Sequence, residues 1–100
     1  LTALGRLEDA AAKFETLIKN GTSYQQVHYF LGETYSKLNR KAESHYNLGI
    51  HHFKKNDYRN ARFHLMRARK QLEDPVKRKT ASDLLKQIDK SLRKEAQKQG

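Results

Sequence analysis

The sequence contains no cysteine, no tryptophan and a single proline among its 100 residues. Without cysteine the chain can form neither disulfide bonds nor thiolate metal sites, although cysteine-free chains occur in oxidising and reducing compartments alike. No apolar run approaches the roughly 18 residues that a membrane-spanning helix needs, and no signal peptide is recognisable. Five glycines and 32% charged residues fit one soluble, helix-rich domain. The composition is thus compatible with more than one cellular compartment.

The usual combinations of catalytic residues are missing as well. The sequence has no serine in a glycine-flanked elbow, no HExxH motif and no two histidines four residues apart that could hold zinc from one helix. We therefore expect no catalytic residue, no cofactor and no metal site in this chain, and no enzyme activity of its own.

Charge is distributed unevenly along the chain. Residues 1–35 carry three basic and four acidic side chains, whereas residues 36–100 carry eighteen basic and seven acidic ones, and the formal net charge is +10. A basic half can attract nucleic acid, an anionic membrane or an acidic protein. The basic residues are mixed with acidic ones and lack the aromatic platform of a single-strand binder. A solvated surface is therefore the simpler interpretation of these charges. Nucleic-acid or anionic-membrane binding is an alternative function.

The segment from Ala42 to Pro75 has the spacing of two helices joined by a turn. Leu48-Gly49 falls on the first helix and Tyr58 at the turn, and the second helix carries Ala61, Leu65 and Ala68. Small residues let two helices approach closely, while large ones on the same face fill the space between them. This pattern resembles the tetratricopeptide repeat (TPR), a helical hairpin of about 34 residues.

The resemblance implies an all-α fold, a TPR-like antiparallel helical-repeat array (α-solenoid) of about five helices with a C-terminal capping helix. Residues 1–100 would form one domain, divided into the end of a truncated repeat (1–21), a first-type helix (22–40), a repeat unit (41–75) and the capping helix (76–100). Because the chain begins with Leu1 in the middle of a motif, we expect a fragment of a longer protein. Three histidines replace aromatic residues of the repeat, and we expect packed or partly solvated core imidazoles at His28, His45 and His52.

The repeat period is interrupted once. Leu31-Gly32 and Leu48-Gly49 are 17 residues apart, half of the period of about 34. The helix predicted over residues 41–54 matches both helix types of the repeat, since Tyr46 and Gly49 fit a second helix while Leu48 and Gly49 fit a first. We predict that this helix packs against both the preceding and the following one.

Capping residues predict where helices begin and end. Asn20-Gly21 should end the first helix, whose preceding turn we place at Gly5, and Ser23 with Gln26 forms a capping box for a helix over about residues 24–38. Asp74-Pro75 should begin the last helix, with Asp as the N-cap. The apolar stripe of that helix consists of Val76, Leu84, Leu85, Ile88 and Leu92.

The resemblance also implies a concave face on which the first helices of successive repeats hold an extended or helical peptide. The residues at the corresponding positions are Tyr29, Glu33, Lys37, Asn47, Ile50, Phe53 and Lys54. Within each helix these positions share a face. A buried seam between two helices needs similar side chains, so the solvent exposure of these residues distinguishes a peptide groove from a seam. Some relatives clamp a C-terminal carboxylate with Lys and Asn; of the key positions only Asn47 fits, and we do not expect that activity.

A narrower resemblance concerns the run from Ser44 to Ala68, together with the basic last helix. These residues are similar to the C-terminal repeat tail of bacterial periplasmic zinc metallopeptidases of the beta-barrel assembly-enhancing type. In that family the catalytic HExxH domain lies upstream, and the tail engages partners in outer-membrane protein assembly. The expected function is thus a protein-protein interaction scaffold for a protein or peptide segment, periplasmic if this resemblance holds and otherwise cytoplasmic. A structural spacer that orders a neighbouring domain is a further alternative.

Overall fold

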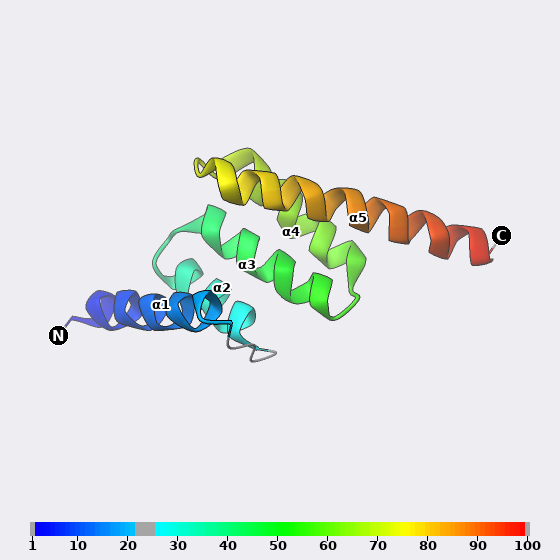
Figure 1. Ribbon diagram of the computed structural model, residues 1–100. Coiled ribbons are helices and arrows are strands. Elements are labelled where there is room, and N and C mark those ends of the chain that lie inside the picture. The colour runs from blue at the N-terminus through cyan, green and yellow to red at the C-terminus, as the bar shows by residue number, and fades with distance from the viewer. Residues whose placement is uncertain (1, 22–25, 100) are drawn as a thin grey trace.

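The computed structural model describes residues 2–21 and 26–99, which form five helices and, over those residues, no strand. Figure 1 shows their arrangement in an elongated molecule of 56 × 26 × 21 Å. The helices are α1 (Ala3–Lys19), α2 (Val27–Lys37), α3 (Lys41–Lys54), α4 (Tyr58–Gln71) and α5 (Pro75–Gln99). The predicted all-α class is confirmed, and none of the described helices is long and apolar enough to cross a membrane.

Side chains cap the starts of three helices. The Gly5 N–H donates to Thr2 Oγ1 (3.0 Å) at the start of α1, and the Val76 N–H donates to Asp74 Oδ1 (2.9 Å) at the start of α5. Asp57 caps α4 through the N–H of Asn60. These carboxylates and hydroxyls satisfy N–H groups that have no partner inside the helix. The predicted start of the last helix at Asp74-Pro75 is therefore confirmed.

Left-handed residues end three helices. Gly21 follows α1 with φ 76°, and Asn39 and Asn56 follow α2 and α3 with φ 61° and 62°. At both asparagines the next residue donates its N–H back over the last turn, from Arg40 to the Tyr35 carbonyl and from Asp57 to the His52 carbonyl. This is the Schellman arrangement, and the two asparagines have the same separation in sequence as the two Leu-Gly pairs.

The first helix begins earlier than we expected. Gly5, which we placed at a turn, lies in the first turn of α1, because Thr2 caps the helix three residues earlier. Ser23 of the predicted capping box and the predicted first residues of the second helix lie outside the described residues. The described part of that helix begins at Val27, and Gln26 makes no side-chain capping hydrogen bond.

Each helix packs against the next one along the chain, and α3 also contacts α5. The α2–α3 pair runs antiparallel, since His28 lies opposite Asn47 while Gly32, one turn later, lies opposite Ser44. The predicted packing of residues 41–54 against both the preceding and the following helix is confirmed, because α3 contacts both α2 and α4.

The close approaches on the two sides of α3 are equivalent. A Cβ atom added to Gly32 would lie 2.7 Å from Leu48 Cγ, and one added to Gly49 would lie 2.5 Å from Leu65 Cγ. The second contact is the first one shifted along the chain by 17 residues. A shift of 17 residues therefore moves each contact on by one helix.

Two hydrophobic clusters stabilise the array from either end. Ala11, Leu31 and Tyr35 are buried between α1 and α2, and the larger cluster between α4 and α5 contains Ala61, Leu65, Ala81, Leu85 and Ile88. The stripe predicted for α5 is wrong at its first position. Val76 is 72% exposed, because α5 meets α4 with the face that includes Ala81, Leu85 and Ile88.

A candidate binding cleft over helix α3

The seven residues expected on a concave face are distributed over several environments. Tyr29, Glu33 and Lys37 on α2 are exposed, as is Lys54 at the end of α3. Phe53 is half-buried against Tyr58 and the α4–α5 cluster, with ring centres 6.0 Å apart. Asn47 and Ile50 are the two that line a common cleft. Phe53 therefore belongs to a helix seam, and the cleft is built partly from residues that we did not predict.

The cleft, here called the α3 cleft, has a volume of about 360 Å³ and is lined by residues of α1, α2, α3 and the start of α5. Its apolar surface comes from Ile18, Tyr46 and Ile50. Its polar lining comes from Glu15, Thr16, Lys19, His28, Asn47 and Lys77. Helices distant in sequence therefore contribute to one concave site.

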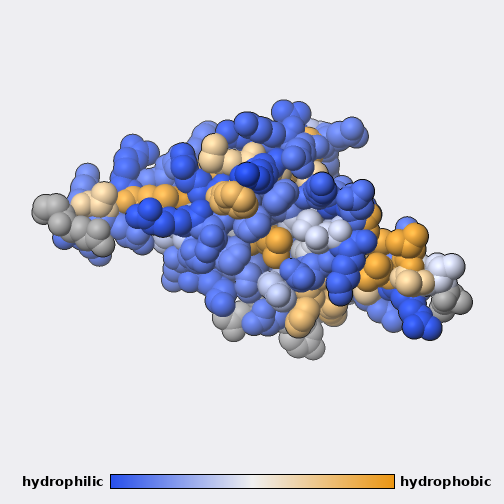
Figure 2. All heavy atoms as spheres, turned by 180° about the vertical axis from the view of Figure 1, so that it is seen from behind, coloured by the Kyte–Doolittle hydropathy of each residue, from blue (hydrophilic) through white to orange (hydrophobic). Residues whose placement is uncertain are grey.

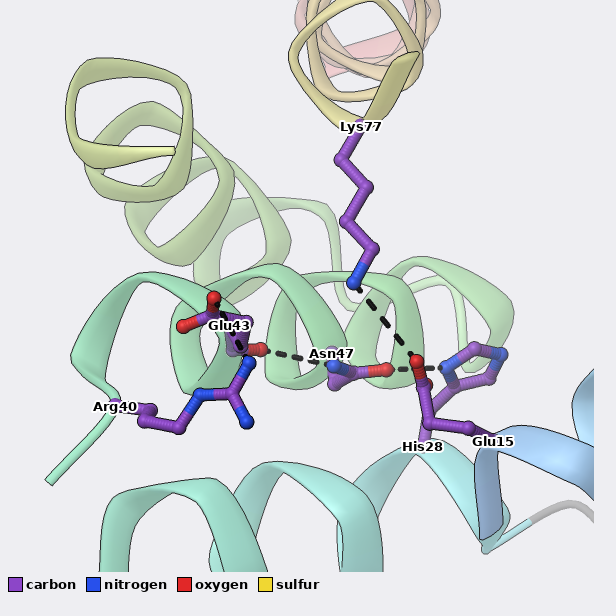
Figure 3. A network of polar contacts seen from close by, with 6 residues as sticks. All are labelled: Glu15, His28, Arg40, Glu43, Asn47 and Lys77. Carbon is purple, nitrogen blue, oxygen red and sulfur yellow. Dashed lines mark hydrogen bonds and ion pairs between the residues drawn. The ribbon is translucent and has the colours of Figure 1, made fainter. Parts of the chain in front are cut away.

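An ion pair spans the α3 cleft (Figure 3). Lys77 Nζ of α5 lies 3.9 Å from Glu15 Oε2 of α1 and 5.6 Å from the centre of the Tyr46 ring. The two charged side chains remain 27% and 40% exposed, and an exposed pair of this kind contributes about 0–1 kcal/mol. Both charges are consequently available to an incoming group at little energetic cost.

A hydrogen-bonded pair fixes one wall of the cleft. Asn47 Nδ2 donates to the Glu43 carbonyl (2.9 Å), so its Oδ1, 3.0 Å from His28 Nδ1, must accept. Nδ1 of His28 therefore carries the proton, and burial lowers the pKa of this histidine below its usual value. Neutral His28 then keeps an acceptor lone pair on Nε2. Asn47 uses its oxygen and one N–H of its amide in these contacts, and at only 2% exposed it offers little surface to a ligand carboxylate.

The residues that α1 and α5 contribute to the α3 cleft had no signal in the sequence. Glu15 and Ile18 lie on α1, and Lys77 is one of several basic residues on α5. No spacing rule relates positions 15 and 77, because α1 is positioned by its packing on α2, whereas α5 is positioned by its packing on α4 and α3. A basic residue opposite an acidic one across a cleft can be found only in the folded chain.

A cluster of imidazoles occupies the seam between α3 and α4. His45 Nδ1 lies 3.0 Å from His64 Nδ1, and the His52 ring stacks on the His64 ring with centres 5.5 Å apart. Burial, together with the neighbouring histidines, lowers the pKa of His64 to about 4. The expectation of packed imidazoles at His28, His45 and His52 is confirmed, since His28 is buried and the other two are half-buried. No group of three or more potential metal ligands occurs among the residues that the structure describes.

The His45–His64 contact occupies the position of the His28–Asn47 contact, shifted by 17 residues along the chain. The same helix-to-helix geometry thus carries a histidine and an amide in one seam and two histidines in the next.

Comparison of the chain with protein-family models, with curated proteins and with solved structures finds no match. The assignment of function therefore depends on the geometry of these surfaces.

Proposed function

We propose that the chain is a TPR-like helical-repeat module that binds a segment of another protein in the α3 cleft. The observation that carries this proposal is the cleft itself, a concave site with an apolar surface and charges of both signs at its edge. Ligand sites in proteins typically combine an apolar lining with a few polar groups that fix orientation. The equivalent glycine–leucine contacts on the two sides of α3 support the repeat assignment.

The size and chemistry of the cleft define what it can accept. A volume of about 360 Å³ suits one or two side chains of a segment that lies across α3. An apolar side chain would contact Ile18 and Ile50, while a carboxylate or an ammonium of the segment would replace one partner of the Glu15–Lys77 ion pair. We therefore expect the bound segment to carry an apolar anchor next to a charged residue.

Selection from a displayed random-peptide library, with the chain as bait, tests this proposal. The Ile50→Arg variant places a charge inside the cleft and should lose binding of the selected peptides. Val76→Arg introduces the same residue at a position that is 72% exposed and outside the cleft, and should retain it. Circular dichroism establishes that both variants are folded. Equal binding of the peptides to the parent and to folded Ile50→Arg would reject the α3 cleft, and a failure to select any peptide would favour a structural spacer.

We retain a narrower proposal, that the module is the non-catalytic repeat tail of a periplasmic zinc metallopeptidase acting in outer-membrane protein assembly. It is supported by the resemblance of the run from Ser44 to Ala68 and by the helix that follows it. The sequence encoded upstream of Leu1 tests it directly. A helix with an HExxH motif there would support the proposal, and an upstream region without such a motif would reject it.

A further inference from the structure

A second concave surface lies between α4 and the end of α5. This basic groove has a volume of about 620 Å³. Its apolar floor consists of Phe63, Met66 and Leu92, and its rim carries four cationic side chains, Arg59, Arg62, Arg67 and Lys70. A shallower hollow shares Arg62 and Leu92 with it and continues to Arg93. The groove shares no lining residue with the α3 cleft.

Six of the seven residues that line the groove lie on α4, and the seventh, Leu92, lies on the part of α5 beyond Asp89. With 25 residues against 14, α5 continues beyond the start of α4, near which Arg62 pairs with Asp89 at 3.3 Å. The segment from 90 to 99 extends the helix by about 15 Å beyond that pair. Figure 2 shows apolar side chains along this protruding end of α5, bordered by hydrophilic ones.

The apolar floor is accessible to solvent. Phe63 is 48% exposed, and its ring is oriented by two neighbours, the Arg67 guanidinium 3.8 Å from the ring centre and the His64 ring with centres 5.1 Å apart. A large aromatic side chain that is exposed and held in place is typical of binding surfaces, where aromatic residues and arginine are enriched.

The charge of the rim is largely uncompensated. Arg62 pairs with Asp89, whereas Arg59, Arg67 and Lys70 form no salt bridge with the residues that the structure describes. Like charges around one groove raise the local potential and favour an anionic occupant. The occupant must therefore combine negative charge with apolar groups that reach the floor.

We propose that the basic groove binds an acidic segment of another protein, with apolar side chains against Phe63, Met66 and Leu92 and carboxylates against the arginines of the rim. Single-stranded nucleic acid fits less well, because its bases stack on free aromatic faces. Here one face of the Phe63 ring is covered by Arg67, and Met66 and Leu92 offer no stacking surface. Arginine also binds carboxylates through two parallel hydrogen bonds, which suits an acidic peptide.

Fluorescence anisotropy with three labelled probes tests this proposal. The probes are a short peptide of Glu, Leu and Phe with its apolar residues on one helical face, a peptide of the same composition with those residues scattered, and a single-stranded oligonucleotide of equal charge. We expect the first peptide to bind most tightly. Phe63→Ala should weaken its binding by about tenfold or more, and Arg59→Glu combined with Arg67→Glu should abolish it.

Matched controls separate the groove from general attraction by a basic chain. Lys13→Glu combined with Lys41→Glu makes the same change in net charge at exposed positions outside the groove, and should retain binding of the first peptide. The Ile50→Arg variant of the α3 cleft should retain it as well. Circular dichroism confirms that each variant is folded.

Four results would overturn the proposal. Equal affinity of the scattered and the first peptide, or an equal loss of binding from the distant charge reversals, would show that general charge attraction suffices. Tighter, Phe63-dependent binding of the oligonucleotide would identify a nucleic-acid site instead. If Ile50→Arg abolished binding of the first peptide, that peptide would bind in the α3 cleft and not in the basic groove. If instead the α3 cleft proved to bind no peptide, binding to the basic groove should still be observed.

Discussion

Leu65 packs directly on the backbone of Gly49, so closely that a Cβ atom at position 49 would lie 2.5 Å from Leu65 Cγ. Real carbon atoms do not approach to this distance, and the glycine is therefore required for the contact between α3 and α4. The equivalent contact between Gly32 and Leu48 joins α2 to α3. The two glycines set the spacing of three consecutive helices.

Gly49→Ala should destabilise the fold by about 1 to 3 kcal/mol, because overpacking forces Leu65 or the helices to shift. Helix propensity alone predicts the opposite, a gain of about 1 kcal/mol. Urea unfolding followed by circular dichroism distinguishes the two. In a Leu65→Ala background, Gly49→Ala should no longer be destabilising. If Gly49→Ala alone were as stable as the parent, the close packing of Leu65 on Gly49 would be contradicted.

Phe53→Ala and Tyr29→Ala should differ in their effect on stability. Phe53 is half-buried against the α4–α5 cluster, and its truncation should cost about 2 to 3 kcal/mol. Tyr29 is 39% exposed, and its truncation should cost less than about 1 kcal/mol. Thermal unfolding of both variants provides the comparison. An equal loss of stability in the two variants would contradict the placement of Phe53 in a seam and of Tyr29 on the surface.

Acid should destabilise the protein in the range set by its histidines. The pKa of His64 is about 4 in the folded chain against an ordinary value of 6.5, so between these values the unfolded chain binds more protons. The free energy of unfolding must then fall as the pH decreases from 6.5 towards 4. Burial lowers the pKa of His28, His45 and His51 in the same direction. For the half-buried His64 we expect a loss of about 1 to 3 kcal/mol, measured by urea unfolding across this range. A flat profile would contradict the burial of these imidazoles.

His64→Asn should convert the second seam into a copy of the first, because His45 would then face an amide as His28 faces Asn47. The two rings now meet through Nδ1 atoms 3.0 Å apart, one of which must donate and the other accept, and protonation of both removes that hydrogen bond. The variant should keep its stability near neutral pH within about 1 kcal/mol.

The same variant should lose much of its acid sensitivity below pH 6.5. Asn47→His provides the reciprocal test, since it would create a second pair of histidines and should steepen the pH dependence. If His64→Asn unfolds with the same pH profile as the parent, the His45–His64 contact is not the source of the effect.

The limits of the helices were largely determined by the sequence alone. Asn20-Gly21 and Asp74-Pro75 mark helix ends through local backbone conformations and short-range hydrogen bonds, and the helix predicted over residues 41–54 has those bounds. The double role of that helix was also readable, because Leu48-Gly49 repeats Leu31-Gly32 after half of the expected period. Caps, left-handed residues and periodicity depend on residues within one or two helical turns of each other. They can therefore be recognised in a single sequence.

The binding surfaces were decided only by the tertiary structure. Periodicity shows which residues share a face of one helix, but it does not show which neighbour covers that face. Phe53 was placed on a groove and lies in a seam, and Val76 was placed on an apolar stripe and is exposed. The ion pair of Glu15 with Lys77 joins α1 to α5, and the basic groove beside Phe63 joins α4 to Leu92 of α5. Such contacts depend on helix lengths and packing across the whole chain, and no local spacing records them.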